Sequence, residues 1–73
     1  MEARQLVWRY LETFGWGSDA DLELAICRRW HKSPSSVRAA RKALVRQGRI
    51  ESAGKRKRTE YGGWAEVWRP KRD

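Results

Sequence analysis

The sequence of 73 residues contains one cysteine, Cys27, and one histidine, His31. A single cysteine excludes an internal disulfide and fits a reducing compartment. Cys27 and His31 alone also fall short of the about four ligands that a structural zinc ion takes. No apolar run approaches the ~20 residues of a membrane-spanning helix, and the acidic, aromatic start does not resemble a signal peptide. We therefore expect an intracellular protein without a metal ion and without membrane contact.

Residues suited to enzymatic chemistry are scarce as well. Cys27 has no activating partner in the sequence, and no glycine-rich phosphate loop with its lysine is present. The chain is long enough for one small domain with a modest core. We expect a single domain over residues 1–73 that is not an enzyme and binds no cofactor.

Acidic side chains are almost missing from the middle of the chain. Residues 1–27 carry two basic and five acidic side chains, net −3, whereas residues 28–58 carry twelve basic side chains and only Glu51, net +11. Residues 59–73 carry three of each, which leaves a net charge of +8 for the chain. Positive charge gathered in one segment favours a cationic face that meets a polyanion. The alternative is a solvated face that only keeps the protein soluble.

Two helices are expected in the first 30 residues. Residues 3–14 have apolar side chains at helical spacing, and Gly15 and Gly17 follow them. Ser18 and Asp21 have the spacing of a capping box at the start of a second helix, over residues 19–30. The predicted inward side chains of these helices are Leu6, Val7, Tyr10, Leu11, Phe14, Leu22, Ile26 and Trp30.

A third helix and a β-hairpin are expected in the remainder. Ser33 is a predicted N-cap before Pro34, and Gly48 follows a helix over residues 34–47. The runs "RIESA" and "WAEVWR" then alternate with a period of two, within a hairpin over residues 49–69. Between them, "GKRKRTEYGG" is predicted to form a long basic loop.

Three helices and a hairpin, with a tight turn between the second and third helices, resemble the winged helix-turn-helix family. Five positions carry the resemblance across residues 23–42, namely small Cys27 flanked by Ile26 and Trp30, followed by Val37 and Ala40. The resemblance implies an α+β fold, a three-helix winged helix-turn-helix with a C-terminal two-stranded hairpin wing, and binding to double-stranded DNA. It also implies a small bacterial regulator or an excisionase-like protein of phages or mobile elements.

This sequence departs from the family pattern at four positions. His31 stands where glycine is common, Lys32 where an aliphatic residue is usual, and Arg41 and Arg49 where leucine is frequent. His31 affects the geometry of the turn, while Arg41 and Arg49 reduce the core and enlarge the basic surface.

The side of the third helix opposite its apolar stripe is the predicted DNA-reading surface. At about 100° per residue, Val37, Ala40 and Leu44 lie on one side, and the opposite side carries Ser35, Arg38, Ala39, Lys42 and Arg46. Arg38 has the fork geometry for guanine, Ser35 or Ala39 suits a base edge, and Lys42 and Arg46 can reach bases or phosphates. Ser36 is a candidate phosphate ligand at the helix start, and Arg41, off the stripe, a candidate backbone contact.

The basic run of the hairpin, Lys55, Arg56, Lys57 and Arg58, is expected at the tip of the wing, against phosphates or an adjacent minor groove. Two other functions stay open. The tryptophans could form a protein-binding patch, or they could stack on single-stranded bases or RNA. A homodimer and a cooperative assembly on DNA are both compatible with the sequence.

Overall fold

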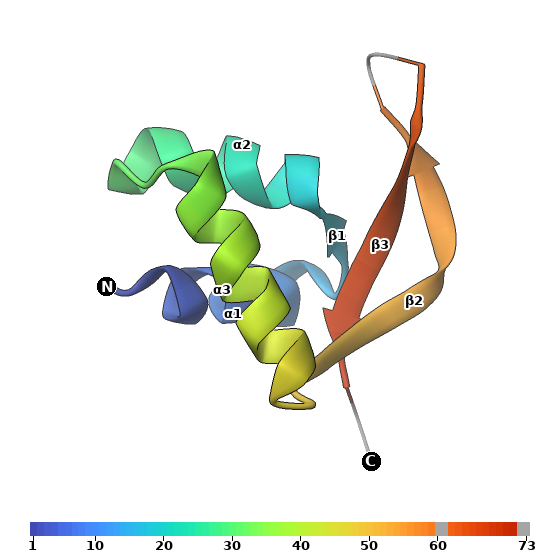
Figure 1. Ribbon diagram of the computed structural model, residues 1–73, viewed down its shortest axis with the longest axis horizontal. Coiled ribbons are helices and arrows are strands. Elements are labelled where there is room, and N and C mark those ends of the chain that lie inside the picture. The colour runs from blue at the N-terminus through green and yellow to red at the C-terminus, as the bar shows by residue number, and fades with distance from the viewer. Residues whose placement is uncertain (60–61, 72–73) are drawn as a thin grey trace.

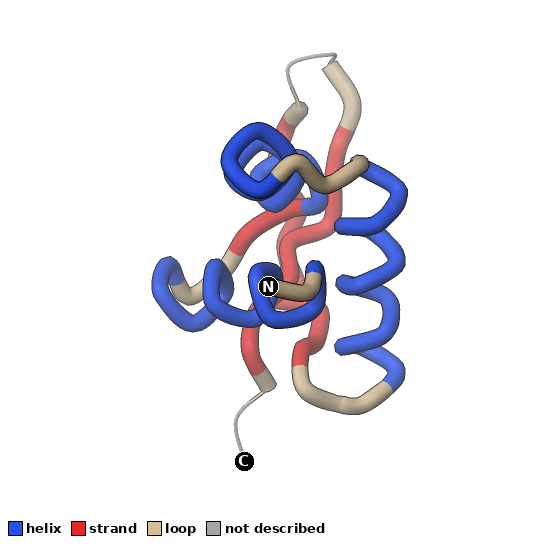
Figure 2. Tube along the Cα trace, turned by 90° about the vertical axis from the view of Figure 1, so that its left-hand side faces the viewer, coloured by secondary structure: helices blue, strands red, loops and turns tan. Residues whose placement is uncertain are grey.

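The computed structural model describes residues 1–59 and 62–71. These residues form three helices and three strands, in the order α1 (Ala3–Phe14), β1 (Gly17–Ser18), α2 (Asp19–Trp30), α3 (Pro34–Arg46), β2 (Ile50–Arg58) and β3 (Trp64–Pro70). The helices gather in front of the sheet in Figure 2, and the distal end of the β2–β3 hairpin extends beyond them in Figure 1. The expected α+β architecture is confirmed.

The helix starts follow from local hydrogen bonding. The Ser18 hydroxyl accepts from the Asp21 amide, and the Asp21 carboxylate accepts from the Ser18 amide, which completes the predicted capping box of α2. The Ser33 hydroxyl accepts from the Ser36 amide at the start of α3, where Pro34 occupies the first turn. These caps satisfy amides that have no partner within the helix.

His31 forms the turn between α2 and α3 in a left-handed conformation, with φ 52° and ψ 42°. Glycine adopts this conformation without steric cost, whereas a residue with a Cβ pays roughly 1 kcal/mol. His31, which stands where glycine is common in the family, therefore keeps the left-handed geometry of the turn at the cost of local strain.

The sheet contains a strand that the sequence did not predict. β1 pairs with β3 through Gly17↔Trp68 and Ser18↔Val67, so the strand order is β1–β3–β2, all antiparallel. A Cβ on Gly17 would lie 2.8 Å from Cε1 of Tyr10, so any larger residue here would have to displace the Tyr10 ring. β1 thereby fixes the connection between α1 and α2 to the hairpin.

The first strand of the hairpin is longer than expected, and it contains the basic run. Ser52 pairs with Trp68 and Arg56 with Glu66, so three residues of β2, around a left-handed Gly54, oppose one residue of β3. Beyond this bulge, residues 55–58 belong to β2 itself. The prediction of a long basic loop was wrong, because the strand continues through the run. Residues 60 and 61 of that expected loop lie outside the described residues.

Nine buried side chains from all three helices and β2 form the core cluster: Leu6, Val7, Leu11, Leu22, Ile26, Val37, Ala40, Leu44 and Ile50. Two residues expected in this core are instead exposed, Phe14 at 63% and Trp30 at 40%. Both are the last residues of their helices, where the neighbouring helix no longer covers them. On β3, Val67 faces inward and is buried.

Candidate nucleic-acid interface

The outward side of α3 matches the predicted stripe. Val37, Ala40 and Leu44 are buried against the other helices, and the opposite side is open to solvent. Every member of the predicted stripe is exposed: Ser35, Arg38, Ala39, Lys42 and Arg46. Small side chains lie toward the start of the helix and long cationic ones toward its end. A helix of this kind can approach a groove closely at one end and reach phosphates at the other.

Acidic side chains from α2 reach this surface at one point. The Arg38 guanidinium lies 3.9 Å from the Glu23 carboxylate, and the Arg38 side chain is 52% exposed. A solvated pair this long contributes little to stability and leaves Arg38 able to exchange its partner. Lys42 and Arg46 have no ion-pair partner among residues 1–59 and 62–71.

Arg41 requires a correction. Its Nε and one terminal nitrogen donate to the two carboxylate oxygens of Asp19, each at 2.9 Å, and its guanidinium lies 4.4 Å from the centre of the Trp68 ring. The side chain is only 13% exposed. Arg41 thus ties α3 to the start of α2 and to β3, and this geometry argues against the expected contact with DNA. Ser36 has a similar internal role, because its hydroxyl and amide both bond Ser33.

Two lysines of the basic run turn back toward the domain. The Lys57 ammonium donates to both carboxylate oxygens of Asp21, at 2.9 and 3.2 Å. The Lys55 ammonium lies 4.7 Å from the centre of the Trp16 ring, in a cation–π contact. Lys57 therefore fixes the hairpin against the start of α2.

The electrostatics of Asp21 follow from this position. Partial burial opposes its ionisation, but the Ser18 amide, the Lys57 ammonium and the Ser18 hydroxyl outweigh that effect and hold the pKa of the Asp21 carboxyl below its ordinary value. Asp21 is therefore a stable anion that caps α2 and holds Lys57 at the same time.

The two arginines of the run have a different environment. Successive strand residues alternate between the faces of a sheet, so Arg56 and Arg58 point away from the face of Lys57. Both are exposed, and Arg58 lies 5.9 Å from the centre of the Trp64 ring, which is itself 64% exposed. Among the described residues neither is in an ion pair, although Glu66 is the cross-strand neighbour of Arg56. They are the members of the run that are free to meet an external anion.

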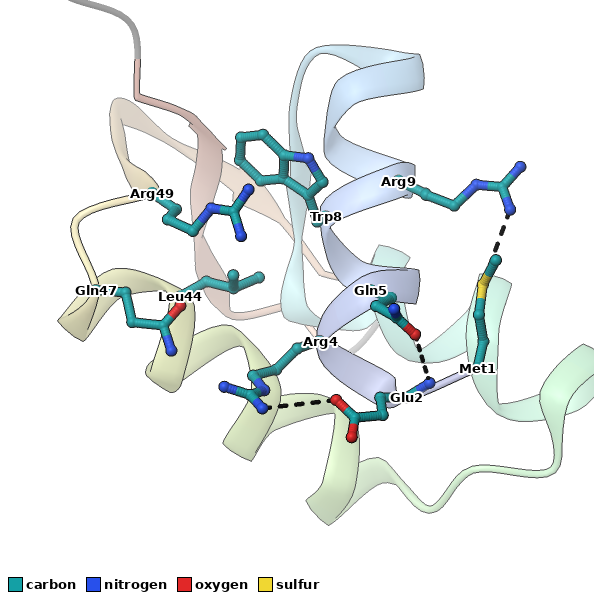
Figure 3. Close-up of a pocket in the computed structure, with 9 residues that line it drawn as sticks. All are labelled: Met1, Glu2, Arg4, Gln5, Trp8, Arg9, Leu44, Gln47 and Arg49. Atoms are coloured by element: carbon teal, nitrogen blue, oxygen red, sulfur yellow. Dashed lines mark hydrogen bonds and ion pairs between the residues drawn. The ribbon is translucent and has the colours of Figure 1, made fainter.

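A further cationic surface adjoins the end of α3. Arg4, Arg9 and Arg49 line a cleft of about 450 Å³ between α1 and the C-terminal end of α3, drawn in Figure 3. The Arg49 guanidinium lies 4.6 Å from the centre of the Trp8 ring, and Glu2 neutralises Arg4 at 3.5 Å. Sequence reasoning placed Arg49 on the basic surface but missed its stacking on Trp8, because residues 41 positions apart carry no local signal of contact.

No family model and no curated protein sequence matches this chain. Among solved structures, the chain is similar to one from a study of the DNA recognition and protein interaction domains of HOP2 and its homologous DNA pairing properties. The two chains share 21% identity and superpose with a TM-score of 0.69, over 94% of this chain and 98% of that one. The fold is a winged helix. In a winged helix, α2 and α3 are the helix-turn-helix pair and the β2–β3 hairpin is the wing.

The described residues were also searched for metal-ligand groups and for membrane-spanning helices. Among residues 1–59 and 62–71, no group of three or more histidine, cysteine or acidic side chains is placed to hold a metal ion. Within the same residues, no helix has the length and apolar character needed to cross a bilayer.

Proposed function

We propose that this winged helix binds double-stranded DNA, with α3 in the major groove and the wing on the flanking backbone. The observation that carries the proposal is the exposed stripe of α3, in which three long cations and two small residues face outward and the core residues face inward. The fold likeness to a domain from a study of DNA recognition supports it. Arg38, Lys42 and Arg46 are the proposed groove residues.

The wing contributes through its arginines in this proposal. Arg56 and Arg58 lie in the distal half of β2, close to the end of the hairpin that projects past the helices in Figure 1. Arginine is favoured in narrow minor grooves and against phosphates because its planar fork carries a permanent charge. Lys55 and Lys57 lie on the other face of the same strand, against Trp16 and Asp21.

The charge arrangement further favours a nucleic acid over random polyanion binding. Seven of the described side chains are acidic, and five of them are in ion pairs with arginine or lysine: Glu2, Asp19, Asp21, Glu23 and Glu51. The acids are thus used largely in internal contacts, and Lys42 and Arg46 of the α3 stripe and Arg56 and Arg58 of the wing are among the described cations that no ion pair engages. A protein of this kind would act by occupying DNA, as a small transcriptional regulator or an architectural factor.

Fluorescence anisotropy with a labelled duplex of random sequence tests the proposal. We expect submicromolar binding at low salt, and competition by unlabelled duplex but only weakly by single-stranded DNA or RNA of equal length. Equal competition by single strands would contradict groove recognition by α3 and favour base stacking on the exposed tryptophans.

Sequence preference is tested by selection from random duplexes with the wild type, Arg38→Ala and Arg56→Ala. Loss of Arg38 should cost about 1–3 kcal/mol on the selected site and relax the preference at one position. Loss of Arg56 should weaken all duplexes alike, because phosphate contacts carry little sequence information. Identical behaviour of the two variants would contradict direct reading by α3.

A further inference from the structure

A second surface lies between α1 and α2, away from the residues proposed to contact DNA. A cleft of about 460 Å³ runs between these helices, and Leu6 and Ile26 form its buried floor. Its rim includes the exposed side chains of Phe14 and Trp30. Tyr10 packs against Phe14, with the ring centres 4.6 Å apart and the rings tilted by 42°. An exposed apolar cleft with aromatic edges is typical of protein-binding surfaces.

The cleft faces away from α3. Glu23 of α2 reaches toward α3, because it approaches Arg38 at 3.9 Å. Ala25 and Arg29 lie about 200–240° further around the same helix, so the outer wall that they give the cleft is on the other side of α2. A ligand in this cleft would therefore leave the outward stripe of α3 open.

The charges beside the cleft indicate the kind of ligand. Arg9 and Arg29 contribute to its lining, one from each helix. Among the described residues neither is in an ion pair: Arg9 contacts the Met1 sulfur at 3.8 Å, and the Arg29 guanidinium lies 5.7 Å from the centre of the Trp30 ring. Within residues 1–59 and 62–71, no acidic side chain lines the cleft. An apolar floor between two available cations is complementary to a segment that has both apolar and acidic side chains.

We propose that the α1–α2 cleft binds an acidic amphipathic segment of another protein, with apolar side chains inserted over Leu6 and Ile26 and carboxylates paired with Arg9 and Arg29. A second copy of this chain suits the cleft poorly, because five of the seven described carboxylates are already held in ion pairs. The protein would then connect a bound partner to whatever its α3 surface binds. This inference does not depend on the proposed DNA binding.

The test is selection of phage-displayed random peptides of about 16 residues, long enough as a helix to span α1 or α2. We expect enriched peptides with acidic residues and apolar residues at helical spacing. Their affinity is then measured by isothermal titration on three variants of α2. Ala25→Glu places a carboxylate in the cleft, four residues before Arg29 and able to pair with it. Arg29→Glu reverses one of the cleft charges.

Arg28→Glu is the matched control, because it makes the same charge change on the neighbouring residue, which lines a different surface groove. The proposal expects affinity to fall at least about tenfold with Ala25→Glu and Arg29→Glu, and less than about twofold with Arg28→Glu. All three positions are exposed, so the substitutions should not disturb the core. Circular dichroism of each variant checks that it folds.

Three results would overturn the inference. One is the absence of any enriched acidic peptide, and another is equal binding to Ala25→Glu and to the wild type. The third is a dimer of the free protein, seen by sedimentation, that Ala25→Glu dissociates, since a second copy would then occupy the cleft. Duplex titration of the same variants keeps the two proposals separate, because Ala25→Glu should bind duplex nearly as the wild type does.

Discussion

Replacing Arg41 with alanine should destabilise the domain by about 2–3 kcal/mol. The change removes two hydrogen bonds from a charged guanidinium to Asp19, both at 2.9 Å, and the contact with the Trp68 ring at 4.4 Å. Hydrogen bonds to charged groups contribute roughly 1.5–3 kcal/mol, and a cation–π contact roughly 0.5–1 kcal/mol at a solvated site. Asp19 remains 28% exposed and is partly rehydrated, which keeps the loss below the roughly 3–5 kcal/mol of a fully buried pair.

The assay is urea unfolding followed by circular dichroism, since removal of Arg41 would itself change the fluorescence of Trp68. We expect a lower midpoint with an unchanged slope, because the same surface is exposed on unfolding. Lys42→Ala is the matched control, one residue away on the exposed stripe, and should change stability by less than about 0.5 kcal/mol. A double-mutant cycle with Asp19→Ala gives the interaction free energy between Arg41 and Asp19. If Arg41→Ala unfolds like the wild type and Lys42→Ala does not, the assignment of inward and outward residues on α3 is wrong.

Two further predictions concern the start and the end of α2. The depressed pKa of Asp21 means that its stabilising contribution is complete above the ordinary aspartate pKa of about 3.9 and is lost as pH falls through the lower folded value. Asp21→Asn should thus be less stable than the wild type at neutral pH and lose less on acidification, and parallel pH curves would contradict this. His31→Gly should raise the unfolding free energy by about 0.5–1 kcal/mol by relieving the left-handed turn, whereas His31→Val should lower it. Thermal unfolding of both variants and the wild type checks this order of stability. A His31→Gly variant less stable than the wild type would show that the turn is unstrained.

The local structure was predictable because short-range chemistry determines it. The Ser18–Asp21 box, the Ser33–Pro34 start and the left-handed Gly48 each depend on neighbouring residues, and the structure has all three. The outward stripe of α3 was predictable for the same reason, since helical periodicity alone separates its two sides.

The features that were missed depend on residues far apart in the chain. β1 contains two residues, too few for a periodic signal, and exists only because β3 pairs with it. The sequence predicts Arg41 as a surface cation, because Asp19, its partner in the fold, lies 22 positions earlier in the chain. Phe14 and Trp30 have the right helical phase for burial but lie at helix ends, where coverage depends on how α1 and α2 pack. Their exposure is the origin of the cleft proposed as a protein-binding site.

The salt dependence of duplex binding by the wild type and by Lys42→Ala tests the central claim most directly. If α3 presents its stripe to DNA phosphates, log affinity for a duplex should fall linearly with log salt, and loss of one phosphate contact should reduce the slope by about 1. The stability of Lys42→Ala should stay within about 0.5 kcal/mol of the wild type, so the change would report on the contact alone. A wild-type affinity that does not vary between about 50 and 200 mM salt, or a Lys42→Ala slope equal to that of the wild type, would contradict the account.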